Sequence, residues 1–215
     1  MGISKNLMKN NKSITLFDWI ISFFAAIGIL FTIAIISWQI IKQHENYDLA
    51  RNLIIEDSFC QSFSKEFAIC KILQNDKNVL QILNDNEWKI IISDSKMIEI
   101  AETEGCSFAS YVDEEKIIGF TKYDDKIIYV NSTWNSISQA LNHEIGHALD
   151  FHFNMLSQKE EFETIFRNES HLMNKYHQKD KLEFFAEIYN YSTKFIHRKN
   201  KKFPKAMNYI STKIS

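Results

Sequence analysis

The stretch "SQALNHEIGHALDFHF", residues 138–153, carries the pattern that decides the fold. It holds two histidines, His143 and His147, four residues apart, and Glu144 directly follows the first. On a helix, positions i and i+4 lie on one face, so both imidazoles can turn toward one metal ion. Imidazole suits Zn²⁺, and Glu144 can reach a water on that ion and take its proton. The stretch therefore predicts a metal-binding helix.

The alternative is an amphipathic helix that carries two histidines by chance. Gly146 weighs against it, because glycine costs a helix about 1 kcal/mol relative to alanine and allows another backbone to approach closely. The pattern H-E-x-x-H is that of metalloproteases. A catalytic zinc in such a site needs a third protein ligand. The prediction of a zinc site therefore depends on whether the sequence contains such a ligand.

Two candidates for the third ligand lie on the same stretch, and neither fits well. His152 follows His143 by nine residues, whereas the extended metzincin pattern needs ten and a glycine between them. Asp150 lies close to the histidine face but a full turn further along. We expect Asp150 to orient a histidine as an outer carboxylate or to have a structural role, and both readings stay open.

A third candidate lies in "DKLEFFAEIYN", residues 180–190. Glu183 and Glu187 are four residues apart and share one helical face. The pair suits one metal ligand and one outer carboxylate that holds the other N–H of a histidine. Each also has a structural reading, since Glu183 could form a capping arrangement with Asp180 and Glu187 could lie on a solvated face. The histidine pattern favours the ligand reading.

The N-terminal region contains an uncharged run of 23 residues from Trp19 to Ile41. As a helix it would span about 34 Å, enough for a hydrocarbon core of about 30 Å. Trp38 lies near its end, as aromatic residues at membrane interfaces do. A buried core helix is the alternative, but such helices usually show a polar stripe. We therefore expect one transmembrane helix.

Lysines before this run predict its orientation. Lys5, Lys9 and Lys12 precede it, which favours a cytoplasmic N-terminus and an extracellular remainder. The run is longer than the apolar region of a signal peptide, about 7–15 residues, and no small-x-small cleavage site follows it. We expect an uncleaved anchor in the cell membrane, with secretion after cleavage as the alternative.

Composition excludes some functions and predicts little else. The chain has 215 residues and a net charge of −2, so it lacks the basic footprint of a nucleic-acid-binding protein. Five glycines and one proline argue against a disordered, linker-rich chain. Cys60, Cys70 and Cys106 are irregularly spaced and odd in number, so we expect reduced thiols rather than a disulfide framework.

Periodicity predicts a mixture of helices and strands. The two runs at 116–121 and 126–131 favour a β-hairpin, and one of them could present a sheet edge to an extended peptide. The expected elements are helices over 42–73, 79–83 and 95–105, a strand over 88–93, the hairpin, and helices from a Ser132 or Thr133 cap to about 153, over 158–168, over 180–196 and after Pro204.

"HEIGHALD" followed by "EFFAEIY" resembles the catalytic domain of anthrax lethal factor and the related secreted Pro-Pro endopeptidases, which are gluzincin-type zinc metallopeptidases. The resemblance covers about residues 80–215, and the tail "FPKAMNYI" is also similar to the family. It implies an α+β, zincin-like domain with a small mixed sheet over the active-site helix and a helical C-terminal lobe. It also implies one Zn²⁺ per chain.

The resemblance implies roles for individual residues. It makes Glu183 the third zinc ligand and Glu187 the outer carboxylate, beside His143 and His147. Tyr176 stands seven residues before Glu183, where the family has a tyrosine that stabilises the developing oxyanion. Without the resemblance, Tyr176 would be read as a packed loop aromatic.

The chain also departs from the family. It lacks the large targeting domains of lethal factor, and it has an apparent anchor where the Pro-Pro enzymes are secreted. The expected layout is a cytoplasmic tail at 1–18, a transmembrane anchor at 19–41, N-terminal helices at 42–78 and a lethal-factor-like zinc metallopeptidase domain at 79–215.

We therefore expect a membrane-anchored, extracytoplasmic zinc metalloendopeptidase that acts on peptides or proteins, with proline-flanked bonds implied by the resemblance alone. An intramembrane metalloprotease is a poor fit, because residues 133–154 are too polar to lie in lipid. The non-enzymatic alternative is a tethered adhesin or binding module on a metallopeptidase fold. The oligomeric state stays open.

Overall fold

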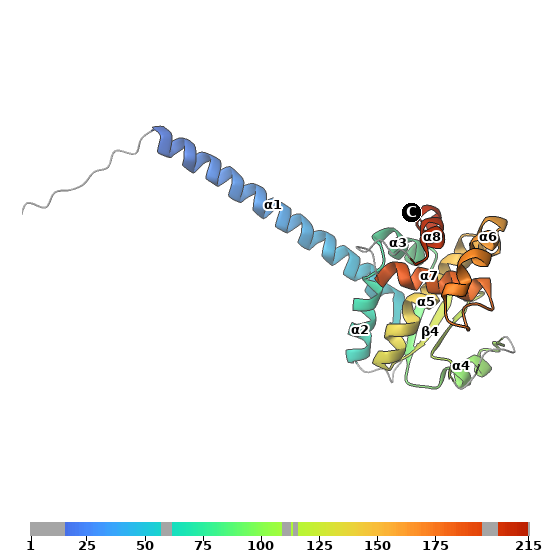
Figure 1. Cartoon of the computed structure of the whole chain (residues 1–215). Coiled ribbons are helices and arrows are strands. Elements are labelled where there is room, and N and C mark those ends of the chain that lie inside the picture. The colour runs from blue at the N-terminus through green and yellow to red at the C-terminus, as the bar shows by residue number, and fades with distance from the viewer. Residues whose placement is uncertain (1–15, 57–61, 109–112, 114–115, 195–201, 215) are drawn as a thin grey trace, which may run out of the picture. The chain divides into compact units, whose positions relative to one another are not determined.

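A computed structural model describes residues 16–56, 62–108, 113, 116–194 and 202–214 (Figure 1). Contacts between residues divide the chain into two units, Met1–His44 and Glu45–Ser215. The first helix, α1 (Leu16–Leu53), includes the uncharged run expected to cross a membrane. Among the described residues one candidate span is found by length and composition, Ile27–Leu53. The apolar window by which it is found is not buried, whereas Ala50 and Leu53 near its C-terminal end belong to the core. One N-terminal apolar helix of this kind fits either a signal sequence or an anchor.

The second unit is an α+β fold with a small mixed sheet. Its four strands are β1 (Ile54–Glu56), β2 (Lys89–Ser93), β3 (Gly119–Lys122) and β4 (Ile127–Asn131), in the order β1-β2-β4-β3. β2 runs parallel to both β1 and β4, whereas β3 and β4 form the expected antiparallel hairpin. β3 is therefore an outer strand of the sheet.

The expectation of a continuous helix over 42–73 was wrong. Ile54 and Ile55 leave the helix and pair in parallel with Ile90 and Ile91 as strand β1. The two β-branched side chains suit a strand, and the tertiary pairing overrides the local helical pattern. The chain is helical again in α2 (Ser62–Ile72). Residues 57–61, with Cys60, lie outside the described residues.

Helices cover both faces of the sheet. Against one face lies α5 (Trp134–His152), which begins at the expected cap, Thr133, whose hydroxyl accepts from Ser136 N. A smaller cluster of Met97, Ala101, Phe120 and Tyr129 packs on the opposite face. The remaining helices are α3 (Lys77–Asp85), α4 (Met97–Thr103), α6 (Glu160–Glu169), α7 (Lys181–Lys194) and α8 (Pro204–Ile214), with short 3-10 turns at Leu156–Gln158 and Ser170–Leu172.

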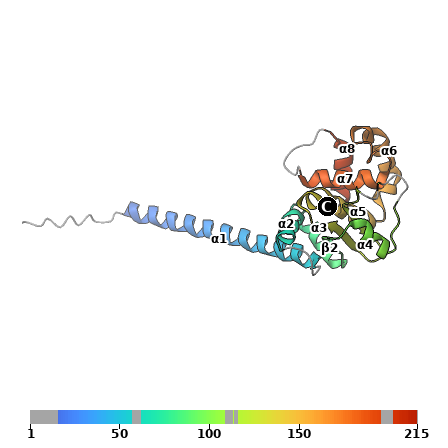
Figure 2. The same ribbon diagram turned by 90° about the horizontal axis from the view of Figure 1, so that it is seen from below.

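The C-terminal helices form a helical lobe beside α5. In two views, α6, α7 and α8 lie side by side (Figure 1 and Figure 2). Their aromatic side chains make the joint core, because Phe162 contacts Phe184, Phe185 and Tyr209. Burying such large rings provides much of the packing energy, and it holds α6, α7 and α8 together.

Candidate metal centre

The two histidines of the opening stretch lie in the last half of α5, one turn apart. His147 is buried, and 12% of the surface of the His143 side chain is exposed to solvent. The centroids of the two rings lie 4.9 Å apart. The helix face that carries them looks toward α7, as the spacing of four residues predicts.

Gly146 brings α7 against this face. A Cβ at Gly146 would lie 2.9 Å from Ala186 Cα and 3.0 Å from the Ala186 carbonyl oxygen. No side chain fits there, so the backbones of α5 and α7 are in direct contact at this point. This confirms the close approach predicted from the glycine. It also places Glu183 and Glu187, on either side of Ala186, opposite the two histidines.

Glu183 lies between the Nε2 atoms of both histidines. Its Oε2 is 3.2 Å from His143 Nε2, and its Oε1 is 3.7 Å from His147 Nε2. One ligand atom from each of His143, His147 and Glu183 lies within 4.8 Å of the others. Two imidazoles and one carboxylate that converge in this way form the donor set of a zinc peptidase site.

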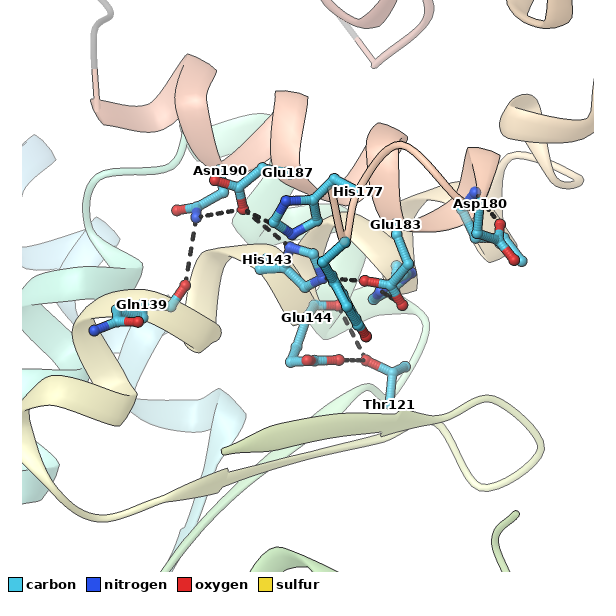
Figure 3. A network of polar contacts seen from close by, with 12 residues as sticks. Thr121, Gln139, His143, Glu144, His177, Asp180, Glu183, Glu187 and Asn190 are labelled. Carbon is cyan, nitrogen blue, oxygen red and sulfur yellow. Dashed lines mark hydrogen bonds and ion pairs between the residues drawn. The ribbon is translucent and has the colours of Figure 1, made fainter. Parts of the chain in front are cut away.

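Glu187 holds the other nitrogen of the first histidine. Its Oε2 is 3.2 Å from His143 Nδ1 and accepts from Asn190 Nδ2 at 3.2 Å. Asn190 also donates to the carbonyl oxygen of Gln139 on α5, at 3.3 Å. Figure 3 shows His143 between the two carboxylates, with Asn190 beyond Glu187. Such a carboxylate fixes the tautomer and orientation of a ligating histidine.

The second histidine is held differently. His147 Nδ1 is buried and has no hydrogen-bond partner among the described residues. The sequence left two roles open for Asp150, that of an outer carboxylate and a structural one. Its carboxylate accepts hydrogen bonds from the backbone N and the hydroxyl of Ser157, at 2.7 Å and 2.6 Å. These contacts anchor the turn after α5 and favour the structural reading of Asp150.

The charges in the cluster fit a cation. Burial would lower the pKa of His143, but its contacts with Glu183 and Glu187 raise that pKa well above its usual value. Burial would raise the pKa of Glu183, but the hydrogen bond from His143 holds it below its usual range. Burial and the charge of His143 lower the pKa of His147. Glu183 and Glu187 thus share the single positive charge of His143. A divalent cation bound between the same side chains would supply positive charge in its place.

Glu144 lies outside the three-residue cluster, on the side of α5 that faces the sheet (Figure 3). It is 6% exposed, and its Oε2 accepts from the hydroxyl of Thr121 on β3 at 2.8 Å. Burial raises the pKa of Glu144 to about 7. A carboxylate with a pKa near neutrality can both accept and return a proton.

Tyr176 and an unexpected neighbour lie in the segment before α7. Tyr176 is 37% exposed, and Asn174 Oδ1 accepts from the backbone N of both Tyr176 and His177. His177 Nε2 lies 3.9 Å from Glu187 Oε2, and its ring is tilted toward His143 at 5.6 Å. Sequence reasoning missed His177, because no helical spacing links a loop residue to α5.

His143, His177 and Glu187 form a second cluster of potential ligands. It is not an independent metal site, because it shares His143 with the first cluster. His152, the first candidate for a third ligand, belongs to neither cluster among the described residues, and its ring packs on Phe153.

A cavity of about 1090 Å³ opens over the cluster. It is lined by β3, by the segment that carries Tyr176 and by the start of α7, and it includes His143, Glu144, His147 and Glu183. The volume suits a peptide-sized ligand. The residues present therefore fit a metal ion in the wall of this cavity.

Comparisons with known proteins agree with this geometry. The model of a family described as "Anthrax toxin lethal factor, N- and C-terminal domain" matches residues 41–213. Among solved structures, the PRO-PRO endopeptidase PPEP-2 from Paenibacillus alvei matches with a TM-score of 0.60 and 15% identity, over 76% of this chain and 98% of that chain. No curated protein matches the chain. The family match begins at residue 41, well before residue 80, where the resemblance expected from the sequence begins.

Proposed function

Because the chain belongs to the anthrax toxin lethal factor family, we propose that it is a zinc metalloendopeptidase with its active site between α5 and α7. The observation that carries the proposal is the convergence of two histidines and one glutamate at the base of the cavity that Glu144 also lines. The α+β metallopeptidase fold is consistent with it. One ion per chain fits the donor set of His143, His147 and Glu183.

His143, His147 and Glu183 would hold the zinc ion through Nε2, Nε2 and a carboxylate oxygen. When bound, zinc supplies Lewis acidity that polarises a carbonyl group and acidifies water. Glu187 keeps His143 in the tautomer that presents Nε2 to the ion, because its carboxylate faces Nδ1 at 3.2 Å. The chain thus provides three ligands and at least one outer support.

Glu144 would act as general base and then as general acid. Its buried carboxylate lines the same cavity as His143, His147 and Glu183, where it would take a proton from the attacking water and pass it to the leaving amine. Tyr176 would donate its hydroxyl to the carbonyl oxygen of the scissile bond, where negative charge develops. Its partial exposure at the cavity leaves room for a substrate beside it.

The substrate would bind as an extended strand on β3. Of the two hairpin strands, β4 is enclosed by β2 and β3, so β3 alone can offer a free edge to a peptide. β3 also lines the cavity. We propose proline-flanked bonds of surface or secreted proteins as the substrate class, by analogy with the Pro-Pro endopeptidase that shares the fold.

The N-terminal apolar helix would anchor the enzyme in the cell membrane, with residues 1–18 cytoplasmic, 19–41 in the bilayer and the catalytic unit outside. The support is the length of the uncharged run together with the lysines that precede it. Protease accessibility of the catalytic unit on intact cells would test this orientation, and protection from added protease would contradict it.

The test of the activity is a screen of quenched-fluorescent peptides with and without a central Pro-Pro pair, using the full-length chain in detergent. The wild type should cleave a subset of peptides. Glu144→Gln should keep its zinc and lose roughly a thousandfold in turnover, since it removes the base. Asp124→Asn is the matched control, because Asp124 lines the same cavity but is exposed, and no hydrogen bond or ion pair joins it to the described residues of the cluster. Retained activity in Glu144→Gln would overturn the assignment.

A further inference from the structure

The carboxylate of Glu144 has one hydrogen-bond partner within the described part of the chain, and it comes from the sheet. Thr121 Oγ1 lies 2.8 Å from Glu144 Oε2 and 3.2 Å from the Glu144 carbonyl oxygen. A hydroxyl carries a single hydrogen, and the carboxylate is both nearer and the stronger acceptor. The hydroxyl therefore donates to Oε2, while no described residue donates to Oε1.

The alternation of β3 explains why Thr121 reaches α5. Successive side chains of a strand point to opposite faces. Phe120 stacks on Tyr129, and Lys122 pairs with Glu104, both on the face away from α5. Gly119 and Thr121 therefore face α5. A Cβ at Gly119 would lie 3.1 Å from Ala140 Cβ and 3.3 Å from Glu144 Cγ, so the glycine allows the strand to lie close enough for the next inward residue to contact Glu144.

Thr121 thus has two connections. Its backbone belongs to the outer strand that lines the cavity, and its side chain contacts the buried carboxylate. Figure 3 shows the pair bridging the hairpin and α5. The metal cluster contributes no hydrogen bond to Glu144 among the described residues, so the position of this carboxylate depends on β3 rather than on α7.

We propose that Thr121 is a positioning residue for the general base. Its hydroxyl holds Oε2 of Glu144 and leaves Oε1 to take the proton of the attacking water. Because the holding group lies on the strand that receives the substrate, a peptide paired with β3 steadies the base at the same time. This role rests on the proposed peptidase function, since it concerns the same site.

A purely structural role for Thr121 predicts a different pattern of variants. Valine keeps the branched shape of threonine and removes the hydroxyl, whereas serine keeps the hydroxyl and removes the methyl group. If Thr121 only packs between β3 and α5, Thr121→Val is the milder change. If it positions Glu144, Thr121→Ser is the milder change. The order of the two variants therefore separates the two roles.

The experiment measures kcat and KM of the full-length zinc-loaded enzyme on a quenched-fluorescent octapeptide with a central Pro-Pro pair. Thr121→Val should lower kcat on the order of tenfold, as expected for a lost hydrogen bond to a charged group, with KM within about twofold and zinc content unchanged. Thr121→Ser should retain most of the activity. Equal or higher activity of Thr121→Val relative to Thr121→Ser would overturn the role of Thr121 while leaving the proposed function intact.

A second readout needs neither zinc nor turnover. In the metal-free chain, Thr121→Val should lower the thermal unfolding midpoint in the wild-type background, because it leaves a buried carboxylate without its donor. The same substitution in Glu144→Ala should have little effect. Equal shifts in both backgrounds would show that the two side chains are not coupled and would overturn the proposal. A wild type that cleaves no peptide would overturn the proposed function and the role of Thr121 together.

Discussion

Two regions of the site are built in opposite ways. The floor, residues 143–147 of α5 with 183–190 of α7, consists of packed helices whose polar side chains bind one another. The rim, strand β3 with segment 173–180, consists of an outer strand and a partly exposed loop. The floor joins its helices at Gly146 without intervening side chains, whereas the rim exposes Tyr176. We propose that the floor binds the metal ion and that the rim binds the substrate.

This division predicts separable effects. Changes in the floor should alter zinc binding and stability, and changes in the rim should alter turnover with zinc unchanged. Variants at Gly146, Glu187 and Asp150 test the floor, and a variant at Tyr176 tests the rim.

The floor can be broken most severely at Gly146. Gly146→Val should force α5 away from Ala186, because even a Cβ would lie 2.9 Å from its backbone. Overpacking of this kind usually costs about 1–3 kcal/mol of unfolding free energy, and more where backbone is in the way. We expect zinc content to fall sharply, measured beside thermal unfolding. Gly28→Ala is the control, since a Cβ there meets nothing within 4 Å; a stable, zinc-loaded Gly146→Val would refute the close packing of the floor.

The rim can be tested at Tyr176. Tyr176→Phe removes the hydroxyl expected to face the developing oxyanion, and loss of one such donor typically costs about 10²–10³ in kcat. Zinc content and the unfolding midpoint should stay at wild-type values. Kinetics on the cleaved peptide with metal analysis would measure both. If zinc were lost along with activity, Tyr176 would belong to the floor and the division would fail.

The outer support of the floor can be weakened at Glu187. Glu187→Gln removes the charge opposite His143 Nδ1, and such outer-carboxylate changes typically cost about 10–100-fold in metal affinity. Competition with a chromophoric chelator would measure the loss. Glu104→Gln, an acid that lines the same cavity and pairs with Lys122, should bind zinc as the wild type does. An unchanged affinity in Glu187→Gln would remove Glu187 from the site.

The smallest effect on the metal centre and its turnover is expected at Asp150. Asp150→Asn weakens two contacts with Ser157 and should lower the unfolding free energy by about 1–3 kcal/mol, measured by urea denaturation. Zinc affinity should not change, because these contacts lead away from the histidines. A drop in zinc affinity comparable to that of Glu187→Gln would instead make Asp150 an outer support of the metal.

The floor was accessible from sequence because helical spacing is local. Residues four apart on α5 and on α7 must share a face, and the resemblance identified which helices belong together. The rim was not accessible in the same way. Which hairpin strand is outermost depends on pairing with β2, and no spacing predicts that Thr121 or His177 reaches the site. Outside the rim, the strand at Ile54–Glu56 was missed for a similar reason, because it forms through its pairing with β2.

The most direct test of the account is the zinc content of the full-length chain, purified in detergent without chelators, beside Glu183→Ala and the control Glu104→Ala. We predict close to one zinc per chain in the wild type and in the control, and a large loss in Glu183→Ala, because two histidines alone form an incomplete site. No zinc in the wild type, or zinc retained in Glu183→Ala, would contradict the three-ligand centre between α5 and α7.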